Sequence, residues 1–570
     1  MIILGISAYY HDAAASILVD GKVVAASSEE RFSRIKHDNS FPVNAIKFCV
    51  KEAKVNYTDI DFIVFYEKPF VKFERILTSH IAHAPKGFRT FVKSMPIWLK
   101  ERLNMVGTIS KSLNVIWNVK FDWDIRFVEH HLSHAAMAYF TSGFSSSAIL
   151  VIDAVGENAT TSIMVGKGER IECLKQQRFP NSIGLLYSSF TYFLGFSVNA
   201  DEYKVMGLAP YGSLDDNQTR SFIEIIKDKL VNIGDDGSII LNQRYFTFMY
   251  GFRMINPQIW GDLFGVPARN HDDPLTQSHM NLAAAIQYVT EQIVLRLAKH
   301  IKDITMEDSL CIVGGCALNC AAMGKIKDSK IFKNIHVPFA CGDDGGSIGA
   351  AMLFYSYMTK FESANLSPYL GPEYPNNFIE DNLRRAGLKY TYMSDEDLFN
   401  SVAALLSTGH IVGWFQGRME FGPRALGNRS ILANPCDPMM KNKINSRIKF
   451  REGFRPFAPA VLQEDAIRYF DSPNSPHMTF TTQVKPDAPD IPAVTHVDRS
   501  ARIQTVTFED NSRLYKLLKS YKQITGISVL LNTSFNVMGE PIVCSPNDAI
   551  HTFLNSGLDI LVINNYIVAK

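Results

Sequence analysis

The chain contains two stretches with the same order of strand, acidic turn and strand, and this repetition limits its possible folds more than any other feature. In the first stretch, the apolar IILGIS leads into the polar turn AYYHDAA, and ASILVDG follows as a strand that ends in the hairpin signal Asp20–Gly21. In the second stretch, between Ala148 and Gly168, AILVIDAVGE ends in an acidic turn that contains glycine, and TTSIMVGKGE returns as a strand. Two such units predict a duplicated α/β architecture.

Two later segments also place a glycine turn at the start of a helix. Leu310 to Lys325 reads as an apolar strand, a Gly-Gly turn and an alanine-rich helix, and FACGDDGGSIGAAML repeats the theme with acidic residues in the turn. Such turns let backbone N–H groups approach a ligand and aim a helix N-terminus at it. The actin, hexokinase and sugar-kinase (ASKHA) superfamily combines this duplication with turns that face a nucleotide cleft. We therefore predict a duplicated actin-like ATPase (ASKHA) domain over residues 1–360.

A second domain is expected because 570 residues are too many for one hydrophobic core. From Tyr357 to Asn376 the hydrophobic periodicity weakens and three prolines occur, which is typical of a linker. The segment from Gly409 to Arg455 is rich in arginine and lysine, and the tail from Gly526 returns to apolar strands. We predict a second α/β domain over residues 375–570.

Composition excludes several classes of function. The net charge of +1, from 58 Lys and Arg against 57 Asp and Glu, provides no overall field to attract nucleic acid or an anionic membrane, so we expect neither as a partner. The N-terminus lacks the basic flank and long apolar core of a signal peptide, and no run of about 20 apolar residues occurs. None of the eight cysteines forms a CxxC pair, so we expect reduced thiols in a cytoplasmic protein.

A metal site is indicated by histidines and aspartates in the first domain. His130 and His134 are four residues apart at the start of a predicted helix and so share a face, although His131 and His134 are also a feasible pair. An HxxxH pair is often structural, but Asp153 and Asp343 stand at turns where they could complete a mixed shell. Imidazole and carboxylate ligands together suit Fe(II), Mn(II) or Zn(II).

His11 lies in the first polar turn, beside Asp12. A buried core rarely places the sequence YYHD between two strands, so we interpret His11 as functional. Its imidazole could donate a hydrogen bond to a carbonyl oxygen that becomes tetrahedral, or move a proton of an acceptor hydroxyl, because its ordinary pKa lies near neutrality.

The run FQGRMEFGPRALGNRSILANP predicts an anion site in the second domain. Its three arginines alternate with apolar residues such as Phe421 and Leu426, which argues against a solvated basic face. Arginine forks suit phosphate oxygens. Lys443, Arg502 and the strand end at Asn532 to Ser534 add further polar groups. Because the chain has no GxxxxGK[ST] loop, the arginines favour an adenylate-forming site, where the α-phosphate of ATP is attacked and pyrophosphate leaves.

Nine motifs along nearly the whole chain resemble the NodU/CmcH family of O-carbamoyltransferases. They are, in order, HDAAASIL, EERFSRIKHD, HHLSHAAMAY, DEYKVMGLAPYG, VGGCALNC, GDDGGSIGAA, RMEFGPRALGNRSILA, FREGFRPFAPAV and LNTSFN followed by GEPIV. The resemblance implies a YrdC-like C-terminal domain that converts carbamoyl phosphate and MgATP to carbamoyl-AMP. It also implies an internal channel to the actin-like domain, where a divalent ion, iron in the family, polarises the carbamoyl group for attack by an acceptor hydroxyl.

The resemblance also assigns roles to residues. It implies His11 as the catalytic histidine and a metal shell of His130, His134, Asp153 and Asp343. It implies an adenylate site formed by Arg418, Arg424, Lys443, Arg502, Asn532 and Ser534. The turn GDDGG departs from the usual family form, which has a small residue after the first aspartate, so Asp344 competes with Asp343 as a ligand.

Other functions predict different features. An ASKHA-type kinase or ATPase would release ADP and would leave the arginine-rich C-terminal half without a role. A threonylcarbamoyl tRNA-modifying protein would require a basic surface, and a binding protein would require both clusters to be accidental. The acceptor is expected to be a natural product or a sugar, held by walls from residues 66–125 and 213–280, which include Tyr245, Phe246, Phe248 and Tyr250; ordinary packing is the alternative for these aromatics. A homodimer is the commonest default.

Overall fold

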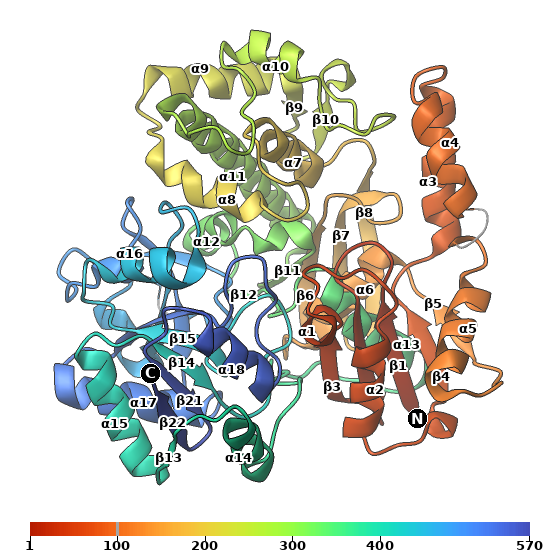
Figure 1. Ribbon diagram of the computed structural model, residues 1–570. Helices are drawn as coiled ribbons and strands as arrows, with labels where there is room; N and C mark the ends of the chain where they lie inside the picture. The colour runs from red at the N-terminus through yellow and green to blue at the C-terminus, as the bar shows by residue number, and fades with distance from the viewer. Residues whose placement is uncertain (99–101, 473) are drawn as a thin grey trace. The chain divides into compact units, whose positions relative to one another are not determined.

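The computed structural model of the chain describes residues 1–98, 102–472 and 474–570 (Figure 1). By its internal contacts the chain divides into two compact units. Unit 1 comprises residues 1–10, 14–24 and 41–366, and unit 2 comprises residues 11–13, 25–40 and 367–570. Two short N-terminal segments, one of which contains His11, therefore belong with the C-terminal unit, which a division into two continuous domains does not anticipate.

Two five-stranded sheets have the same topology, with a central strand antiparallel to the next strand of the chain and parallel to a later one. In the first sheet the order is β3-β2-β1-β4-β5, in which β1 is antiparallel to β2 and parallel to β4. In the second the order is β12-β11-β6-β7-β8, in which β6 is antiparallel to β7 and parallel to β11. The strands are β1 Ile2–Ser7, β2 Ala14–Val19, β3 Lys22–Ser28, β4 Phe62–Phe65, β5 Ile125–Phe127, β6 Ser146–Ile152, β7 Ala159–Lys167, β8 Arg170–Arg178, β11 Ser309–Val313 and β12 Asn334–His336. This duplication confirms the predicted actin-like (ASKHA) architecture.

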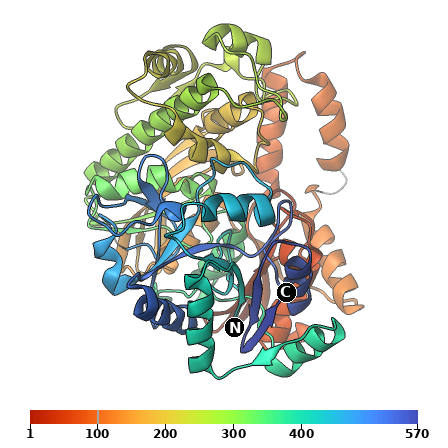
Figure 2. The ribbon, with the colours of Figure 1, turned by 60° about the vertical axis from the view of Figure 1, so that its left-hand side comes forward.

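Helices of very different length complete unit 1. The longest, α11, contains 29 residues, and α3 and α4 lie side by side as a hairpin in both ribbon views (Figures 1 and 2). The helices are α2 Val43–Glu52, α3 Pro69–Ala82, α4 Phe88–Ile97, α5 Met105–Trp117, α6 His130–Phe140, α7 Ile183–Phe193, α8 Glu202–Leu208, α9 Asn217–Ile225, α10 Pro257–Phe264, α11 Gln277–Thr305, α12 Cys320–Asp328 and α13 Gly346–Met358, and a small hairpin joins β9 Val231–Ile233 to β10 Ile239–Leu241. No helix of the described residues is long and apolar enough to cross a membrane.

Close packing of α6 against α13 depends on glycine. A Cβ atom added at Gly349 of α13 would lie 1.8 Å from the carbonyl oxygen of Ser133 in α6, and one added at Gly345 would lie 2.0 Å from the carbonyl oxygen of Ala340. A larger residue at Gly349 would force α6 and α13 apart, and one at Gly345 would displace the turn before α13. The sequence GDDGGSIGAA therefore serves to bring the turn before α13 against the start of α6.

Unit 2 is built on one eight-stranded mixed sheet with the order β13-β22-β21-β14-β15-β20-β16-β19. Separate clusters of buried apolar residues lie on its two faces, one of them formed with α15 and α17. The strands are β13 Thr391–Tyr392, β14 Val412–Phe415, β15 Arg429–Ala433, β16 Ala458–Leu462, β19 Gln504–Val506, β20 Val529–Ser534, β21 Ile560–Ile563 and β22 Tyr566–Ala569, with β17 Thr481–Gln483 and β18 Ser500–Arg502 as a separate pair. The helices are α1 Glu30–Ser33, α14 Asn376–Arg385, α15 Asp395–Ser407, α16 Met440–Ile444, α17 Ser512–Thr525 and α18 Pro546–Leu554. The second domain is thus α/β, as predicted.

Candidate functional site

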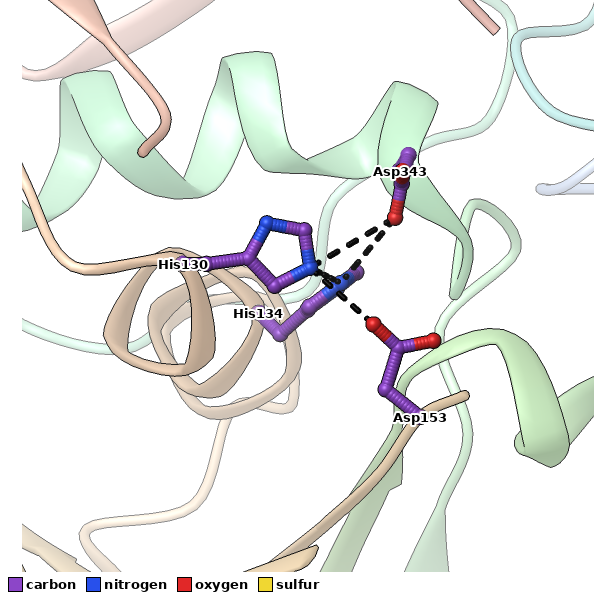
Figure 3. Close-up of side chains that lie close together, drawn as sticks. All are labelled: His130, His134, Asp153 and Asp343. Atoms are coloured by element: carbon purple, nitrogen blue, oxygen red, sulfur yellow. Dashed lines mark hydrogen bonds and ion pairs between the residues drawn. The ribbon is translucent and has the colours of Figure 1, made fainter. Parts of the chain in front are cut away.

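Two histidines and two aspartates form a compact group in unit 1 (Figure 3). His130 and His134 lie one turn apart at the start of α6, so their side chains share a face. Asp153 directly follows β6, and Asp343 lies in the glycine turn that precedes α13. The structure therefore brings together the four residues that the resemblance assigns to a metal ion.

The ligand atoms of this group converge on one point. Nε2 of His130 lies 3.1 Å from Oδ2 of Asp153 and 3.1 Å from Nε2 of His134. Oδ1 of Asp343 lies 3.6 Å from Nε2 of His130 and 3.4 Å from Nε2 of His134. All four side chains are buried. Two ring nitrogens and two carboxylates that face one another in a buried space favour a cation among them, and this donor set fits a divalent transition-metal ion.

The carboxylates determine the charge of the group. Burial alone would lower the pKa of His130, but the hydrogen bond with Asp153 and the charges of Asp343 and Asp153 outweigh burial and raise the pKa to about 9. Burial opposes ionisation of Asp153, yet the contact with His130 lowers the pKa of Asp153. Without a metal, His130 therefore holds a proton near neutral pH, and a metal ion must displace that proton.

The two alternative ligands point elsewhere. Nδ1 of His131 lies 2.7 Å from Oγ of Ser162, and burial lowers the pKa of His131 to about 3. Oδ1 of Asp344 accepts a hydrogen bond of 2.9 Å from the backbone N–H of Gly345. Neither residue belongs to the group of four.

Other polar residues of unit 1 surround the histidines. The ring centroid of Tyr66 is 5.2 Å from that of His130, and the buried hydroxyl of Tyr66 has no hydrogen-bond partner among the described residues. Glu67 and Lys72 form a buried ion pair of 2.8 Å. Burial raises the pKa of Glu157 to about 7. These residues were not selected from the sequence. Only Glu157 could have been noticed, because it ends AILVIDAVGE as an acidic residue in the turn after an apolar strand.

His11 is part of a second histidine group, which lies in unit 2. Nδ1 of His11 lies 2.8 Å from Oδ2 of Asp12, and Nδ1 of His37 lies 2.8 Å from Oδ1 of the same carboxylate. Burial opposes ionisation of Asp12, but the two histidines outweigh it and lower the pKa of Asp12. Asp12 therefore orients both imidazoles. His37 was missed, although it stands in the motif EERFSRIKHD.

The arginines of the predicted anion site have different surroundings. Arg418 donates to the carbonyl oxygens of Leu370 at 2.7 Å and Gly371 at 3.2 Å. Arg429 is fully buried, donates to four backbone carbonyls and stacks on Phe415 at 3.6 Å from its ring centroid. These contacts of Arg418 and Arg429 stabilise the backbone around the motif.

Glu420 shapes the turn that follows Arg424. Its Oε1 accepts hydrogen bonds from the backbone N–H groups of Leu426 and Asn428 at 2.7 Å and of Arg429 at 3.2 Å. The side chain of Asn532 reaches the carbonyl of Ala425 from the adjacent sheet at 3.3 Å. The sequence GPRALGNR is therefore a turn held by hydrogen bonds, and the side chain of Asn532 lies against it.

Lys449, which sequence reasoning did not select, lies with the predicted site residue Ser534. Its ammonium donates to Oδ1 of Asn536 at 2.7 Å, to the carbonyl of Asn536 at 3.0 Å and to Oγ of Ser534 at 3.3 Å. Burial, followed by the charges of Arg451, Arg455 and Lys36, lowers the pKa of Lys449 well below its usual range. The ammonium group of Lys449 is therefore surrounded by oxygens of Ser534 and Asn536, and other cations act on it from nearby.

Two other predicted residues lie apart from this contact network. Lys443 is partly exposed and forms an ion pair of 2.7 Å with Asp437. Arg502 ends β18, and its Nε is buried without a hydrogen-bond partner among the described residues. The structure thus links Ser534 directly to Lys449 and not to Lys443.

The segments expected to form acceptor walls contact each other. Oγ of Ser79 in α3 donates to the carbonyl of Met249 at 2.8 Å, and the ring of His83 lies 5.3 Å from that of Tyr250. Phe246, in contrast, is fully buried beside Trp260, with ring centroids 5.8 Å apart. Phe246 therefore packs in the core of unit 1.

Comparison with known proteins identifies the family. The sequence profile described as carbamoyltransferase N-terminus matches residues 2–352, and that described as carbamoyltransferase C-terminus matches residues 403–570. The chain belongs to the carbamoyltransferase family. The enzyme is 46% identical to the uncharacterized protein sll1178 of Synechocystis sp., over 100% of the chain and 96% of that protein. It is 37% identical to nodulation protein NolNO of Sinorhizobium fredii, over 99% of the chain and 79% of NolNO.

A third relative, nodulation protein NolO of Bradyrhizobium diazoefficiens, is 37% identical over 78% of the chain and 79% of NolO. These matches confirm the resemblance that the nine motifs indicated. They also show that both halves of the chain belong to the same kind of enzyme, a carbamoyltransferase.

Proposed function

We propose that the enzyme makes carbamoyl-AMP from carbamoyl phosphate and ATP and transfers its carbamoyl group to a hydroxyl of a small molecule. Water first converts carbamoyl phosphate to carbamate and phosphate. An oxygen of the carbamate then displaces pyrophosphate from the α-phosphate of ATP. In the last step the oxygen of the acceptor hydroxyl bonds to the carbamoyl carbon, the bond to AMP breaks, and the hydroxyl proton passes to a base.

The observation that carries the proposal is the cation cluster around Lys449. Its hydrogen-bond partners are hydroxyl, amide and carbonyl oxygens of Ser534 and Asn536, none of which neutralises its charge. Burial and the charges of Arg451 and Arg455 lower the pKa of Lys449, so a bound phosphate would offset these charges and favour the protonated lysine. Lys449, with Arg424 and Asn532 at the neighbouring turn, is proposed to bind the phosphates of ATP and carbamoyl phosphate.

The histidine–aspartate group is proposed to hold Fe(II) or another divalent ion. The residues fit such an ion because both imidazole Nε2 atoms and both carboxylates face one buried point. A bound ion would act there as a Lewis acid toward the carbamoyl oxygen. Burial of His130, His134, Asp153 and Asp343 keeps bulk water from the reacting groups, which limits hydrolysis of a reactive anhydride.

His11 is proposed as the base for the acceptor hydroxyl. Its Nδ1 lies 2.8 Å from a carboxylate oxygen of Asp12, so this carboxylate would stabilise the charge of the imidazole once it has taken up the proton. A natural product or sugar is proposed as the acceptor, with residues 66–125 and 213–280 as its walls, since these segments contact each other through Ser79 and Met249.

Product analysis tests the proposal. The enzyme is incubated with ATP, carbamoyl phosphate and Fe(II) without an acceptor, and we expect AMP and pyrophosphate only when carbamoyl phosphate is present. Lys449→Met should abolish this reaction, whereas Lys389→Met, at an exposed lysine of the same unit, should not. ADP as the product, or turnover that ignores carbamoyl phosphate, would support an ASKHA-type kinase or ATPase instead.

A further inference from the structure

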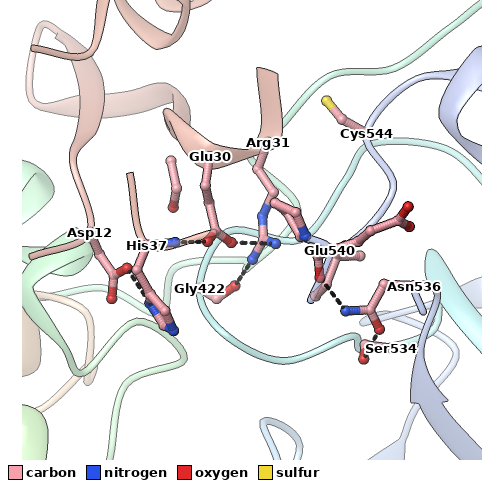
Figure 4. A network of polar contacts seen from close by, with 12 residues as sticks. Asp12, Glu30, Arg31, His37, Gly422, Ser534, Asn536, Glu540 and Cys544 are labelled. Carbon is pink, nitrogen blue, oxygen red and sulfur yellow. Dashed lines mark hydrogen bonds and ion pairs between the residues drawn. The ribbon is translucent and has the colours of Figure 1, made fainter. Parts of the chain in front are cut away.

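Residues 25–40 form a segment of unit 2 that contacts the histidine group on one side (Figure 4). The backbone N–H of Glu29 donates to the carbonyl of Ala13 at 2.7 Å, and the N–H of Ala13 donates to the carbonyl of Asp38 at 2.8 Å. The turn that carries His11 is thus held between two points of this segment. His37, from the same segment, shares the Asp12 carboxylate with His11.

A buried ion pair extends these contacts toward the arginine turn. The carboxylate of Glu30 and the guanidinium of Arg31 are 2.7 Å apart, and both side chains are nearly inaccessible to solvent. The other oxygen of Glu30 accepts a hydrogen bond of 2.9 Å from the backbone N–H of His37. Arg31 in turn donates to the carbonyl of Gly422 at 2.9 Å, two residues before Arg424.

The contacts therefore form an unbroken series from His11 to Asp12 and on through His37, Glu30 and Arg31 to Gly422. Figure 4 shows the part of this series from Asp12 to Gly422. Gly422 has φ of +105°, a backbone conformation that a residue with a side chain rarely adopts. The carbonyl that Arg31 holds is therefore that of a tightly specified turn, and its position fixes where the chain continues into Arg424.

Simple anchoring of the segment does not require this ion pair. Arg34 already donates to the carbonyls of Ile542 at 2.7 Å and Pro541 at 2.8 Å. A buried ion pair contributes little net stability because both charges lose their hydration, so a role other than anchoring explains Glu30 and Arg31 better.

We propose that Glu30 and Arg31 are positioning residues that couple the His11–Asp12–His37 group to the Gly422–Arg424 turn. A change in the histidine group then alters how Arg424 is held, and a change at Arg424 alters the orientation of His11. The coupling rests on the proposed function, in which Arg424 serves formation of carbamoyl-AMP and His11 serves carbamoyl transfer. Formation of carbamoyl-AMP would then depend on the state of the histidine group, and carbamoyl transfer would depend on how Arg424 is held.

A double-mutant cycle in the full-length enzyme tests the coupling. Carbamoyl phosphate-dependent exchange of labelled pyrophosphate into ATP is measured for wild type, Asp12→Asn, Arg31→Lys and the double variant. We expect Asp12→Asn to raise the KM for ATP by about fivefold, the lower end of typical couplings between linked sites. When Arg31→Lys is already present, adding Asp12→Asn should not raise the KM for ATP any further.

Arg34→Lys is the matched control, because Arg34 anchors the same segment but contacts neither the Asp12 carboxylate nor the Gly422 carbonyl. In that background Asp12→Asn should still raise the KM about fivefold. The coupling would be refuted if Asp12→Asn left the KM for ATP unchanged. It would also be refuted if the double variant showed the product of the two single-variant effects on the KM for ATP.

A second measurement needs no substrate. The imidazole resonances of His11 and His37, assigned with His11→Gln and His37→Gln, are compared by NMR in wild type, Glu30→Gln, Arg31→Lys and Arg34→Lys. We expect the two signals to shift in Glu30→Gln and Arg31→Lys and to stay in place in Arg34→Lys. Unmoved signals in Arg31→Lys overturn the coupling. Wild-type enzyme without any pyrophosphate exchange would contradict the proposed function, while shifted signals would still support the coupling.

Discussion

Metal binding to the histidine–aspartate group should depend steeply on pH. The perturbation is a change of pH between 7 and 9 in enzyme freed of metal. The pKa of His130 is raised to about 9 because Asp153 and Asp343 outweigh the effect of burial. A metal ion binds only the neutral imidazole, so each ion must displace one proton from His130.

The magnitude follows from this pKa. At pH 7, roughly one molecule in a hundred has a neutral His130, which weakens the apparent affinity by about 2.7 kcal/mol relative to the fully deprotonated group. At pH 9 about half of the molecules are neutral. The affinity should therefore rise about 50-fold from pH 7 to pH 9, with nearly one proton released per ion over most of that range.

The assay is titration with Co(II), followed by its visible absorption and by calorimetry in buffers of different ionisation enthalpy. Asp344→Asn is the matched control for Asp343→Asn, since Asp344 lies outside the group. The metal-free protein should show the opposite trend. Stabilisation by protonated His130 is complete below pH 6.5 and disappears as pH rises through about 9. An affinity that is flat between pH 7 and 9, with no proton release, would refute the assignment of His130 as a protonated ligand.

Other perturbations test the packing and the anion site. Gly349→Ala should destabilise the fold by about 2 kcal/mol or more, seen in thermal unfolding, and weaken Co(II) binding, because α6 and α13 must separate. Arg429→Met should cost about 3 kcal/mol or more by denaturant unfolding, since it removes the hydrogen bonds that the buried guanidinium donates to four backbone carbonyls. Phosphate binding should take up protons, measured by calorimetry in two buffers, because an anion raises the lowered pKa of Lys449; Lys449→Met should abolish the uptake.

The histidine–aspartate group could be anticipated from the sequence only in part, because only part of its geometry is local. A spacing of four residues fixes the relation of His130 and His134 on any helix, and Asp153 follows a strand whose apolar run is unmistakable. The choice between Asp343 and Asp344 could not be made in this way. It depends on which carboxylate accepts the backbone N–H of Gly345, a contact set by the close approach of α13 to its neighbours.

The residues of the proposed anion site are harder to predict from the sequence because arginine has two uses in a folded protein. The same guanidinium that binds phosphate can satisfy backbone carbonyls in a turn, and Arg429 does the latter while fully buried. The lysines pose a similar problem. Lys443 and Lys449 lie six residues apart in one basic stretch, and only the fold shows that Lys449 is buried beside Ser534 while Lys443 pairs with Asp437.

The place of His11 could not be read from its own neighbours in the sequence, and it changes how the two halves of the reaction are related. His11 follows β1 of the actin-like sheet, yet its contacts belong to the C-terminal unit, through Asp12 and the segment that carries His37. The proposed base for carbamoyl transfer is thus held by contacts within the same unit that is proposed to form carbamoyl-AMP, so a change in those contacts would affect both proposed steps.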